Sequence, residues 1–349
     1  MAEFSISDRL VGDRHPTFII AELSANHRKS FDIAAKTLRA MKKAGADAVK
    51  FQTYTPNTIT IDSDTEYFKI AHGSLWDGKT LYQLYEEAYT PWEWFSDLSS
   101  LARELDMISF SSPFDLSAVE FLEEMGVPAY KVASFEITDI PLIERIASKG
   151  KPVLISTGIA TLADMEEAAA ACRKMGNTRI ALLKCSSTYP TDFGELNLKT
   201  IPHLRDTFGF TVGLSDHSRG ISSAIAAVAL GATIVEKHFI LDRALGGPDA
   251  AFSLMPEEFL AMVKAIREVE QALGRVNYEL SAGAMAGRIH CRSLFAVKDI
   301  KAREPFTTEN VRSIRPGHGL HPRYLNYVLT RRARVDVKRA TPIGWPEVD

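Results

Sequence analysis

Thr211-Val-Gly-Leu-Ser-Asp-His-Ser218 begins as a short apolar run and ends in a cluster of polar residues. Further along the chain, Thr233-Ile-Val-Glu-Lys-His-Phe239 repeats the pattern. Such a run is typical of a buried parallel strand that carries polar side chains at its C-terminal end. Each run contains a histidine near its end, His217 and His238. The repetition favours a two-histidine site for a divalent metal over two unrelated structural histidines.

Six further segments have the same strand-like character: residues 18–24, 48–54, 108–114, 129–134, 153–158 and 180–187. Most of the gaps between them have apolar residues at helical spacing, as in residues 31–43, 162–175, 222–230 and 256–272. Strands that alternate with helices in this way predict an α/β fold, a (β/α)₈ TIM barrel. A doubly wound open sheet is the competing fold.

The 349-residue chain changes character after Gly274. We predict a TIM-barrel domain over residues 1–275, a linker over residues 276–287 and a small second domain with short elements over residues 288–349. Residues 56–78 follow the second predicted strand, so they are expected over the active face of the barrel. This segment is interpreted as a substrate lid or as a solvated insertion.

Composition excludes several classes of protein. A hydrophobic fraction of 46% indicates a globular protein, and the net charge of −3 suggests neither a nucleic-acid nor a membrane partner. The chain lacks a long apolar stretch and an apolar signal core, so we expect a cytoplasmic protein. The cysteines, Cys172, Cys185 and Cys291, have no metal-ligand spacing, and Cys185 is expected to be a small core residue.

In a TIM barrel the catalytic groups come from the C-terminal ends of the strands. Here those ends offer Glu22, Asn26, His27, Lys50, Gln52, Tyr54, Ser111, Ser112, Lys131, Ser134, Glu136, Ser156, Thr157, Gly158, Ser186, Ser187, Tyr189, Ser215, Asp216, His217, Glu236, Lys237 and His238.

Two of these residues, Lys50 and Lys131, stand in otherwise apolar strands. Beside many hydroxyl groups they favour a site for phosphate or carboxylate. The alternatives are an internal ion pair with Glu22 or Glu136, and a Schiff-base lysine as in an aldolase. The sequence contains no glycine-rich nucleotide loop, which argues against nucleotide chemistry.

Motifs over nearly the whole chain resemble the sialic acid synthase family: Phe18-Ile-Ile-Ala-Glu-Leu-Ser-Ala-Asn-His27, Lys50-Phe-Gln-Thr-Tyr-Thr-Pro56, Ser111-Ser-Pro-Phe114, Tyr130-Lys-Val-Ala-Ser134, Ser156-Thr-Gly158, Gly213-Leu-Ser-Asp-His217 and Glu236-Lys-His-Phe239. The tail, with Arg315-Pro-Gly317, resembles the family's antifreeze-like (SAF) domain. Within the family, the first two motifs are most similar to the pseudaminic acid synthases. Neuraminate synthases usually have Glu-Ile-Gly-Ile-Asn-His at the first strand, and often Asn where this chain has Ser187.

The resemblance implies an enzyme that condenses phosphoenolpyruvate with an open-chain amino-sugar aldehyde, adds water and releases phosphate. For the pseudaminate branch the sugar is 2,4-diacetamido-2,4,6-trideoxy-L-altrose, and neuraminate or legionaminate synthesis are the alternatives. A carbohydrate-binding scaffold without activity is the hypothesis from another class. The intact set of lysines and histidines argues against it.

Carried over by position, the resemblance assigns His217 and His238 to Mn²⁺ or Mg²⁺, and Glu22 to proton transfer or the positioning of water. Phosphoenolpyruvate would be held by Lys50, Ser112, Lys131, Ser134, Ser187, Tyr189 and Ser215. The sugar would contact Gln52, Tyr54, Glu136, Asp249 and Arg315. The family also implies a domain-swapped homodimer, in which the SAF domain of one subunit caps the barrel of the other.

Overall fold

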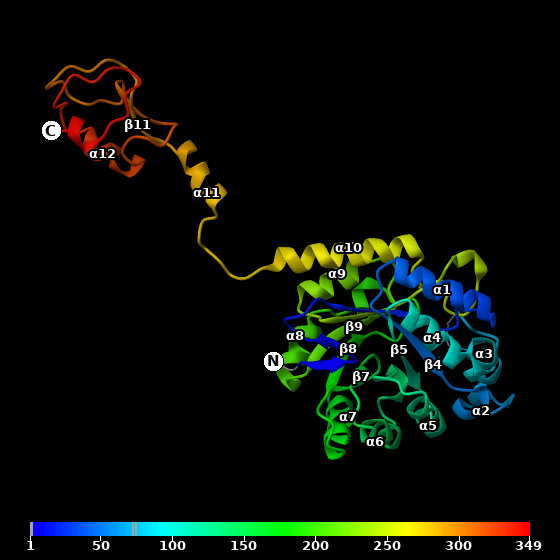
Figure 1. The fold of residues 1–349 in the computed structure, drawn as a ribbon. Coiled ribbons are helices and arrows are strands. Elements are labelled where there is room, and N and C mark those ends of the chain that lie inside the picture. Colours follow the sequence, from blue (N-terminus) through cyan, green and yellow to red (C-terminus); the bar gives the residue numbers. More distant parts are fainter. Residues whose placement is uncertain (1–2, 72, 74) are drawn as a thin grey trace. The chain divides into compact units, whose positions relative to one another are not determined.

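The computed structural model describes residues 3–71, 73 and 75–349 (Figure 1). The chain divides into two compact units, Met1–Gly274 and Arg275–Asp349. In the part of the chain that the structure describes, no helix has the length and apolar character needed to cross a membrane.

The first unit is a closed barrel of parallel strands in the order β10-β3-β4-β5-β6-β7-β8-β9. The closure confirms the predicted TIM barrel and rules out the open sheet. The strands are β3 (Phe18–Glu22), β4 (Ala48–Thr53), β5 (Ile108–Pro113), β6 (Tyr130–Val132), β7 (Val153–Ser156), β8 (Ile180–Cys185), β9 (Thr211–Asp216) and β10 (Ile234–His238).

Helices surround the barrel (Figure 1). They are α1 (Phe31–Lys43), α4 (Phe95–Glu104), α5 (Leu116–Glu124), α6 (Ile140–Ser148), α7 (Leu162–Lys174), α8 (Thr200–Phe208), α9 (Ser222–Ala229) and α10 (Pro256–Leu273). Local sequence sets their ends. The Ser30 side chain accepts a hydrogen bond from the Ile33 amide at the start of α1, and Pro256 occupies the first turn of α10. The predicted helices are therefore confirmed to within one or two residues.

The first unit also contains elements outside the barrel repeat. A hairpin of β1 (Phe4–Ile6) and β2 (Arg9–Val11), which the sequence analysis did not predict, precedes the barrel. The long connection after β4 contains α2 (Pro56–Ile59), a 3₁₀ turn (Glu66–Phe68) and α3 (Leu81–Ala88). Further 3₁₀ turns are Trp92–Trp94, Ser134–Glu136, Phe193–Glu195 and Arg243–Leu245.

The barrel register decides which side chains face the interior. In β9 and β10, Ser215 lies opposite Glu236, and Asp216 lies opposite Lys237. Because successive side chains of a strand point to opposite faces, residues that pair across strands share a face. The layer that contains Ser215 and Glu236 faces the barrel interior, and the layer that contains Asp216 faces the surrounding helices.

The second unit has its own small core, which includes Leu294, Phe306, Val311, Val328 and Ile343. Its strands β11 (Ser293–Ala296) and β12 (Val311–Ile314) are antiparallel. Its helical elements are α11 (Ala282–Gly287), α12 (Leu325–Val328) and the 3₁₀ turns Arg288–His290, Pro322–Tyr324 and Trp345–Glu347. The exposed residues predicted as a linker thus include the short helix α11.

Candidate active site

A cavity of about 330 Å³ lies at the C-terminal ends of the barrel strands. Each barrel strand, or the chain just after it, contributes to its wall, as expected for the active face of this fold. The lining residues are Glu22, Lys50, Gln52, Tyr54, Ile59, Trp76, Leu84, Tyr85, Ala88, Phe114, Lys131, Ala133, Ser134, Phe135, Glu136, Ser156, Cys185, Tyr189, Ser215, His217, Glu236, His238, Pro248 and Asp249.

Most of the predicted site residues line this cavity, and three do not. Ser112 pairs with Gln52 and so shares its inward face, but it is buried and is not part of the cavity lining, and its hydroxyl has no hydrogen-bond partner among the described residues. Ser187 contacts a lining residue instead, because its hydroxyl donates a hydrogen bond of 2.8 Å to the Ser134 hydroxyl. Arg315 belongs to the second unit, so the cavity of the first unit does not contain it.

Lys50 and Lys131 share the base of the cavity with two buried carboxylates. The Lys50 Nζ atom lies 3.0 Å from Glu22 Oε2 and 2.9 Å from Glu236 Oε1. The same Glu236 oxygen lies 3.9 Å from the Lys131 Nζ atom and accepts a hydrogen bond of 2.9 Å from the Ser215 hydroxyl. The ion pair between Lys50 and Glu22, weighed from sequence as an alternative, is therefore present.

The two lysines differ in their electrostatic surroundings. Burial lowers the pKa of Lys50, but the charges of Glu22 and Glu236 outweigh it and raise that pKa on balance. Burial also lowers the pKa of Lys131, and Glu236 only partly offsets the effect. Sequence analysis gave no role to Glu236, although a carboxylate inside an apolar strand is itself a sign of a buried partner.

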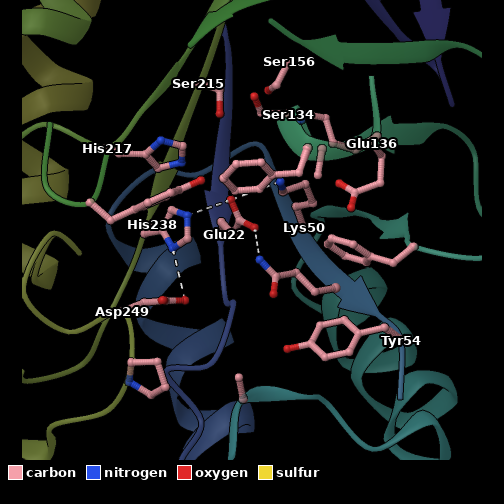
Figure 2. Close-up of a pocket in the computed structure, with 18 of the residues that line it drawn as sticks. Glu22, Lys50, Tyr54, Ser134, Glu136, Ser156, Ser215, His217, His238 and Asp249 are labelled. Atoms are coloured by element: carbon pink, nitrogen blue, oxygen red, sulfur yellow. Dashed lines mark hydrogen bonds and ion pairs between the residues drawn. The ribbon is translucent and has the colours of Figure 1, made fainter. Parts of the chain in front are cut away.

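The two histidines face each other across one side of the cavity (Figure 2), with ring centroids 5.2 Å apart. The His217 Nδ1 atom lies 2.9 Å from the Ser186 carbonyl oxygen. Because a carbonyl oxygen only accepts, Nδ1 carries the proton and the Nε2 lone pair is left for a ligand. Burial lowers the pKa of His217, but Cys185 and the Ser186 carbonyl raise it to about 9, so a metal ion that binds the Nε2 atom at neutral pH would displace a proton from it.

His238 has the opposite surroundings. Its Nε2 atom lies 3.2 Å from Glu22 Oε2, and its Nδ1 atom has no hydrogen-bond partner among the described residues, with Asp249 Oδ2 3.7 Å away. Burial lowers its pKa, against the opposing effect of Glu22 and Asp249. Within the described residues no cluster of three or more His, Cys, Asp or Glu side chains is placed to hold a metal. A buried imidazole nitrogen without a partner nevertheless has the donor chemistry of a divalent-metal ligand, so the histidine pair fits one.

Tyr54 and Glu136 lie across the cavity from His217, His238 and Asp249 (Figure 2). Burial raises the pKa of Glu136 to about 7. Its Oε2 atom has no hydrogen-bond partner within the described residues. This side of the cavity therefore holds a carboxyl group that is partly protonated at neutral pH.

The connection after β4 forms part of the wall, as its position in the sequence predicted. Ile59 and Trp76 line the cavity, and the Trp76 indole donates a hydrogen bond of 3.0 Å to the Pro248 carbonyl oxygen. Residues 72 and 74 of the predicted lid lie outside the described residues. Leu84, Tyr85 and Ala88 also line the cavity, which the sequence did not indicate. Their spacing predicts only an amphipathic helix and does not show that this helix contacts the site.

Three expectations need correction. Asp216 and Lys237 were expected at the rim, but they alternate with the histidines and face away from the cavity, where they form an ion pair of 2.6 Å. Ser111 likewise points away from the cavity and lies 2.6 Å from the Thr53 hydroxyl. Cys185 is buried as expected, but it also lines the cavity, with its sulfur 3.7 Å from His217 Nδ1.

Comparison with known proteins gives matches over both units. Residues 37–278 match the NeuB family, and residues 292–349 match the SAF domain. The chain is 47% identical over 321 residues to a pseudaminic acid synthase of Campylobacter jejuni, covering 92% of this chain and 93% of that protein. It is 43% identical over 335 residues to a pseudaminic acid synthase of Helicobacter pylori, covering 96% of this chain and 98% of that protein. The solved sialic acid synthetase of Leptospira borgpetersenii is 31% identical with a TM-score of 0.73, covering 82% of this chain and 95% of that chain.

Proposed function

The chain belongs to the NeuB family, and on that premise we propose that it is a pseudaminic acid synthase. It condenses phosphoenolpyruvate with the open-chain aldehyde of 2,4-diacetamido-2,4,6-trideoxy-L-altrose, adds water and releases phosphate. The observation that carries the proposal is the convergence of two buried lysines, a histidine pair and a carboxylate on one cavity at the active face.

Phosphoenolpyruvate is an anion, and the base of the cavity suits one. Lys50 and Lys131 supply positive charge, and Ser134 and Ser215 supply hydroxyl donors. Gly158 leaves room for the hydroxyl cluster, because a Cβ atom there would lie 2.7 Å from Ser134 Oγ.

Glu22 connects the lysines to the histidines. Burial raises its pKa, but His238 and Lys50 together lower it well below its ordinary value, so it is a carboxylate at neutral pH. It also accepts a hydrogen bond of 2.8 Å from the Gln52 amide. In this position Glu22 orients His238 and positions the attacking water.

The reaction needs an electrophilic aldehyde. His217 and His238 would hold Mn²⁺ or Mg²⁺, and such an ion supplies polarisation of the aldehyde oxygen. The C3 atom of phosphoenolpyruvate forms a bond to the aldehyde carbon, and the aldehyde oxygen takes up a proton and becomes a hydroxyl. Water positioned by Glu22 adds to the oxocarbenium-like C2 centre and gives up one proton, which balances the proton that the aldehyde oxygen takes up. The C2 hydroxyl of the tetrahedral intermediate then becomes the carbonyl of the product, its proton passes to the phosphate, and the bond between C2 and the phosphate oxygen breaks.

Gln52, Tyr54, Glu136 and Asp249 hold the sugar in this proposal, which places the aldehyde between the histidine side and the aromatic side of the cavity. The family resemblance adds Arg315 from the second unit of a partner subunit in a domain-swapped homodimer. We assign the enzyme to the cytoplasm, the compartment that supplies phosphoenolpyruvate. Light scattering tests the dimer. Mixing inactive Lys50→Ala with inactive Arg315→Ala subunits is expected to restore about a quarter of the activity if the site is shared between protomers.

Phosphate release from phosphoenolpyruvate with Mn²⁺ tests the activity directly. Turnover with the diacetamido altrose sugar and not with N-acetylmannosamine is the expected result. Turnover with N-acetylmannosamine alone would refute the proposed sugar substrate and leave the proposed condensation reaction standing. Borohydride trapping separates this mechanism from that of an aldolase, because a Schiff base on Lys50 or Lys131 would leave a stable adduct.

A further inference from the structure

The cavity has an apolar part that the proposed chemistry does not use. Ile59 of α2, Leu84, Tyr85 and Ala88 of α3, and Phe114 after β5 line it. We refer to these five residues as the apolar cup. Leu84 and Ala88 are one helical turn apart, so both point from the same face of α3 into the cavity.

Aromatic contacts connect the apolar cup to the sugar side of the site. The Tyr54 ring makes edge-to-face contacts with Tyr85 and Phe114, with centroid distances of 5.6 and 5.1 Å. Tyr54 lies across the cavity from His217 and His238 (Figure 2), so its contacts with Tyr85 and Phe114 associate the cup with the side of the cavity opposite the histidine pair. The lysines, the carboxylates Glu22 and Glu236, and the histidine pair belong to the other end.

The helix that supplies most of the cup is held in position by local contacts. At the start of α3 the Thr80 hydroxyl accepts from the Gln83 amide at 3.2 Å, and the Gln83 side chain accepts from the Thr80 amide at 3.0 Å. This capping box fixes where the helix begins and therefore which face it presents. The Trp76 indole anchors the preceding segment to the Pro248 carbonyl. The cup is thus formed before a substrate arrives, which favours selective binding.

We propose that the apolar cup determines sugar specificity by binding a methyl group of the substrate, either the C6 methyl of a 6-deoxy sugar or the methyl of a 4-acetamido group. This inference rests on the proposed function, because it concerns the sugar of that reaction. N-acetylmannosamine has hydroxyl groups at both positions. Against Leu84 and Ala88 a methyl group meets carbon, whereas a hydroxyl there loses its water partners.

The size of the preference follows from the type of pocket. A hydrophobic pocket rejects a ligand that adds a hydroxyl by about 10- to 100-fold in kcat/KM, and by no more than that. The cup responds to methyl groups and not to the configuration of the sugar carbons, so it separates diacetamido trideoxy sugars as a class from hydroxylated ones.

The test measures phosphate release by the full chain with phosphoenolpyruvate, Mn²⁺ and three sugars. These are the 2,4-diacetamido-2,4,6-trideoxy sugar, its counterpart with a 6-hydroxyl, and its counterpart with a 4-hydroxyl. We expect wild type to lose about 10- to 100-fold in kcat/KM with one hydroxylated sugar, and that sugar identifies which methyl group the cup binds.

Variants assign the preference to the cup. Ala88→Ser adds a hydroxyl that can form a hydrogen bond with the hydroxylated sugar. The ratio of kcat/KM for the trideoxy sugar to that for the hydroxylated sugar should therefore fall about fivefold or more, while the KM for phosphoenolpyruvate stays unchanged. Leu84→Ala should narrow it by lowering turnover of the trideoxy sugar. Leu81→Ala is the matched control, because Leu81 lies on the same helix outside the cavity lining and should leave the preference unchanged.

Two failures are distinguishable. A wild type that turns over all three sugars within about twofold would overturn the cup alone, as would a Leu84→Ala variant that retains the wild-type preference. A chain that releases no phosphate from phosphoenolpyruvate with any of the sugars would overturn the proposed function, and the cup with it.

Discussion

Removing Lys237 tests how the barrel supports its histidines. Lys237 and Asp216 form a 2.6 Å ion pair whose side chains are fully shielded from solvent. The pair lies between β9 and β10 on the outer face of the barrel, one residue before each histidine. Besides Lys237, Asp216 accepts hydrogen bonds from the Ser218 amide, the Ser218 hydroxyl and the Ser223 hydroxyl. Among the residues that the structure describes, the Lys237 ammonium has one other acceptor, the Ser218 carbonyl oxygen at 2.6 Å.

Removing Lys237 and removing Asp216 should therefore lower the free energy of unfolding by different amounts. Breaking a buried ion pair typically costs about 3–5 kcal/mol, because one charge is left without its partner. In Lys237→Met the Asp216 carboxylate keeps three hydrogen-bond donors, so we expect the free energy of unfolding to fall by about 3 kcal/mol. In Asp216→Leu the ammonium keeps one acceptor, so we expect about 5 kcal/mol. The double variant replaces both charges with apolar groups and should lie within about 1–2 kcal/mol of wild type.

Thermal unfolding of the full chain, followed by circular dichroism at pH 7, measures these differences. For a domain of this size, about 3 kcal/mol corresponds to a lower Tm by roughly 6–12 °C. Two results would refute the reasoning. One is equal destabilisation by both single variants, and the other is a double variant less stable than either of them.

The other predictions concern the cavity. Gly158→Ala should lower the affinity for phosphoenolpyruvate at least about tenfold, because the added Cβ would lie 2.2 Å from Ser187 Oγ and 2.7 Å from Ser134 Oγ; an unchanged KM would contradict it. The Glu136 carboxyl has its pKa raised from 4.5 to about 7, so the folded state binds its proton more tightly, and stability falls as pH rises through that interval. The free energy of unfolding of Glu136→Gln should therefore rise relative to that of wild type by up to about 3 kcal/mol by pH 7, at about 1.4 kcal/mol per pKa unit. Denaturant unfolding at pH 4.5 and 7.5 measures this. If the stability difference between variant and wild type is the same at both pH values, burial does not raise the pKa of Glu136. Chelation by EDTA should abolish phosphate release and added Mn²⁺ should restore it, whereas activity that persists in EDTA would exclude the metal.

The sequence by itself determined the barrel. Apolar runs that alternate with amphipathic helices are local patterns, and local residues mark where some helices begin, as Ser30 does at the cap of α1 and Pro256 in the first turn of α10. The sequence also indicated the histidines and lysines as a site, because a polar residue inside or directly after a buried strand is costly unless it has a partner. These features depend on neighbours along the chain, and His217, His238, Lys50 and Lys131 line one cavity of the structure.

The tertiary structure alone decided which polar residues share a cavity. At the end of β10, His238 faces inward and Lys237 outward, and only the register with β9 and β3 fixes that choice. Glu236 of β10 pairs with Lys50 of β4, two strands away in the barrel, and the apolar cup joins Ile59 and Leu84 from the connection after β4 with Phe114 from the connection after β5. Such contacts depend on strand pairing and barrel closure, which bring together residues far apart in the chain, and no local pattern encodes them.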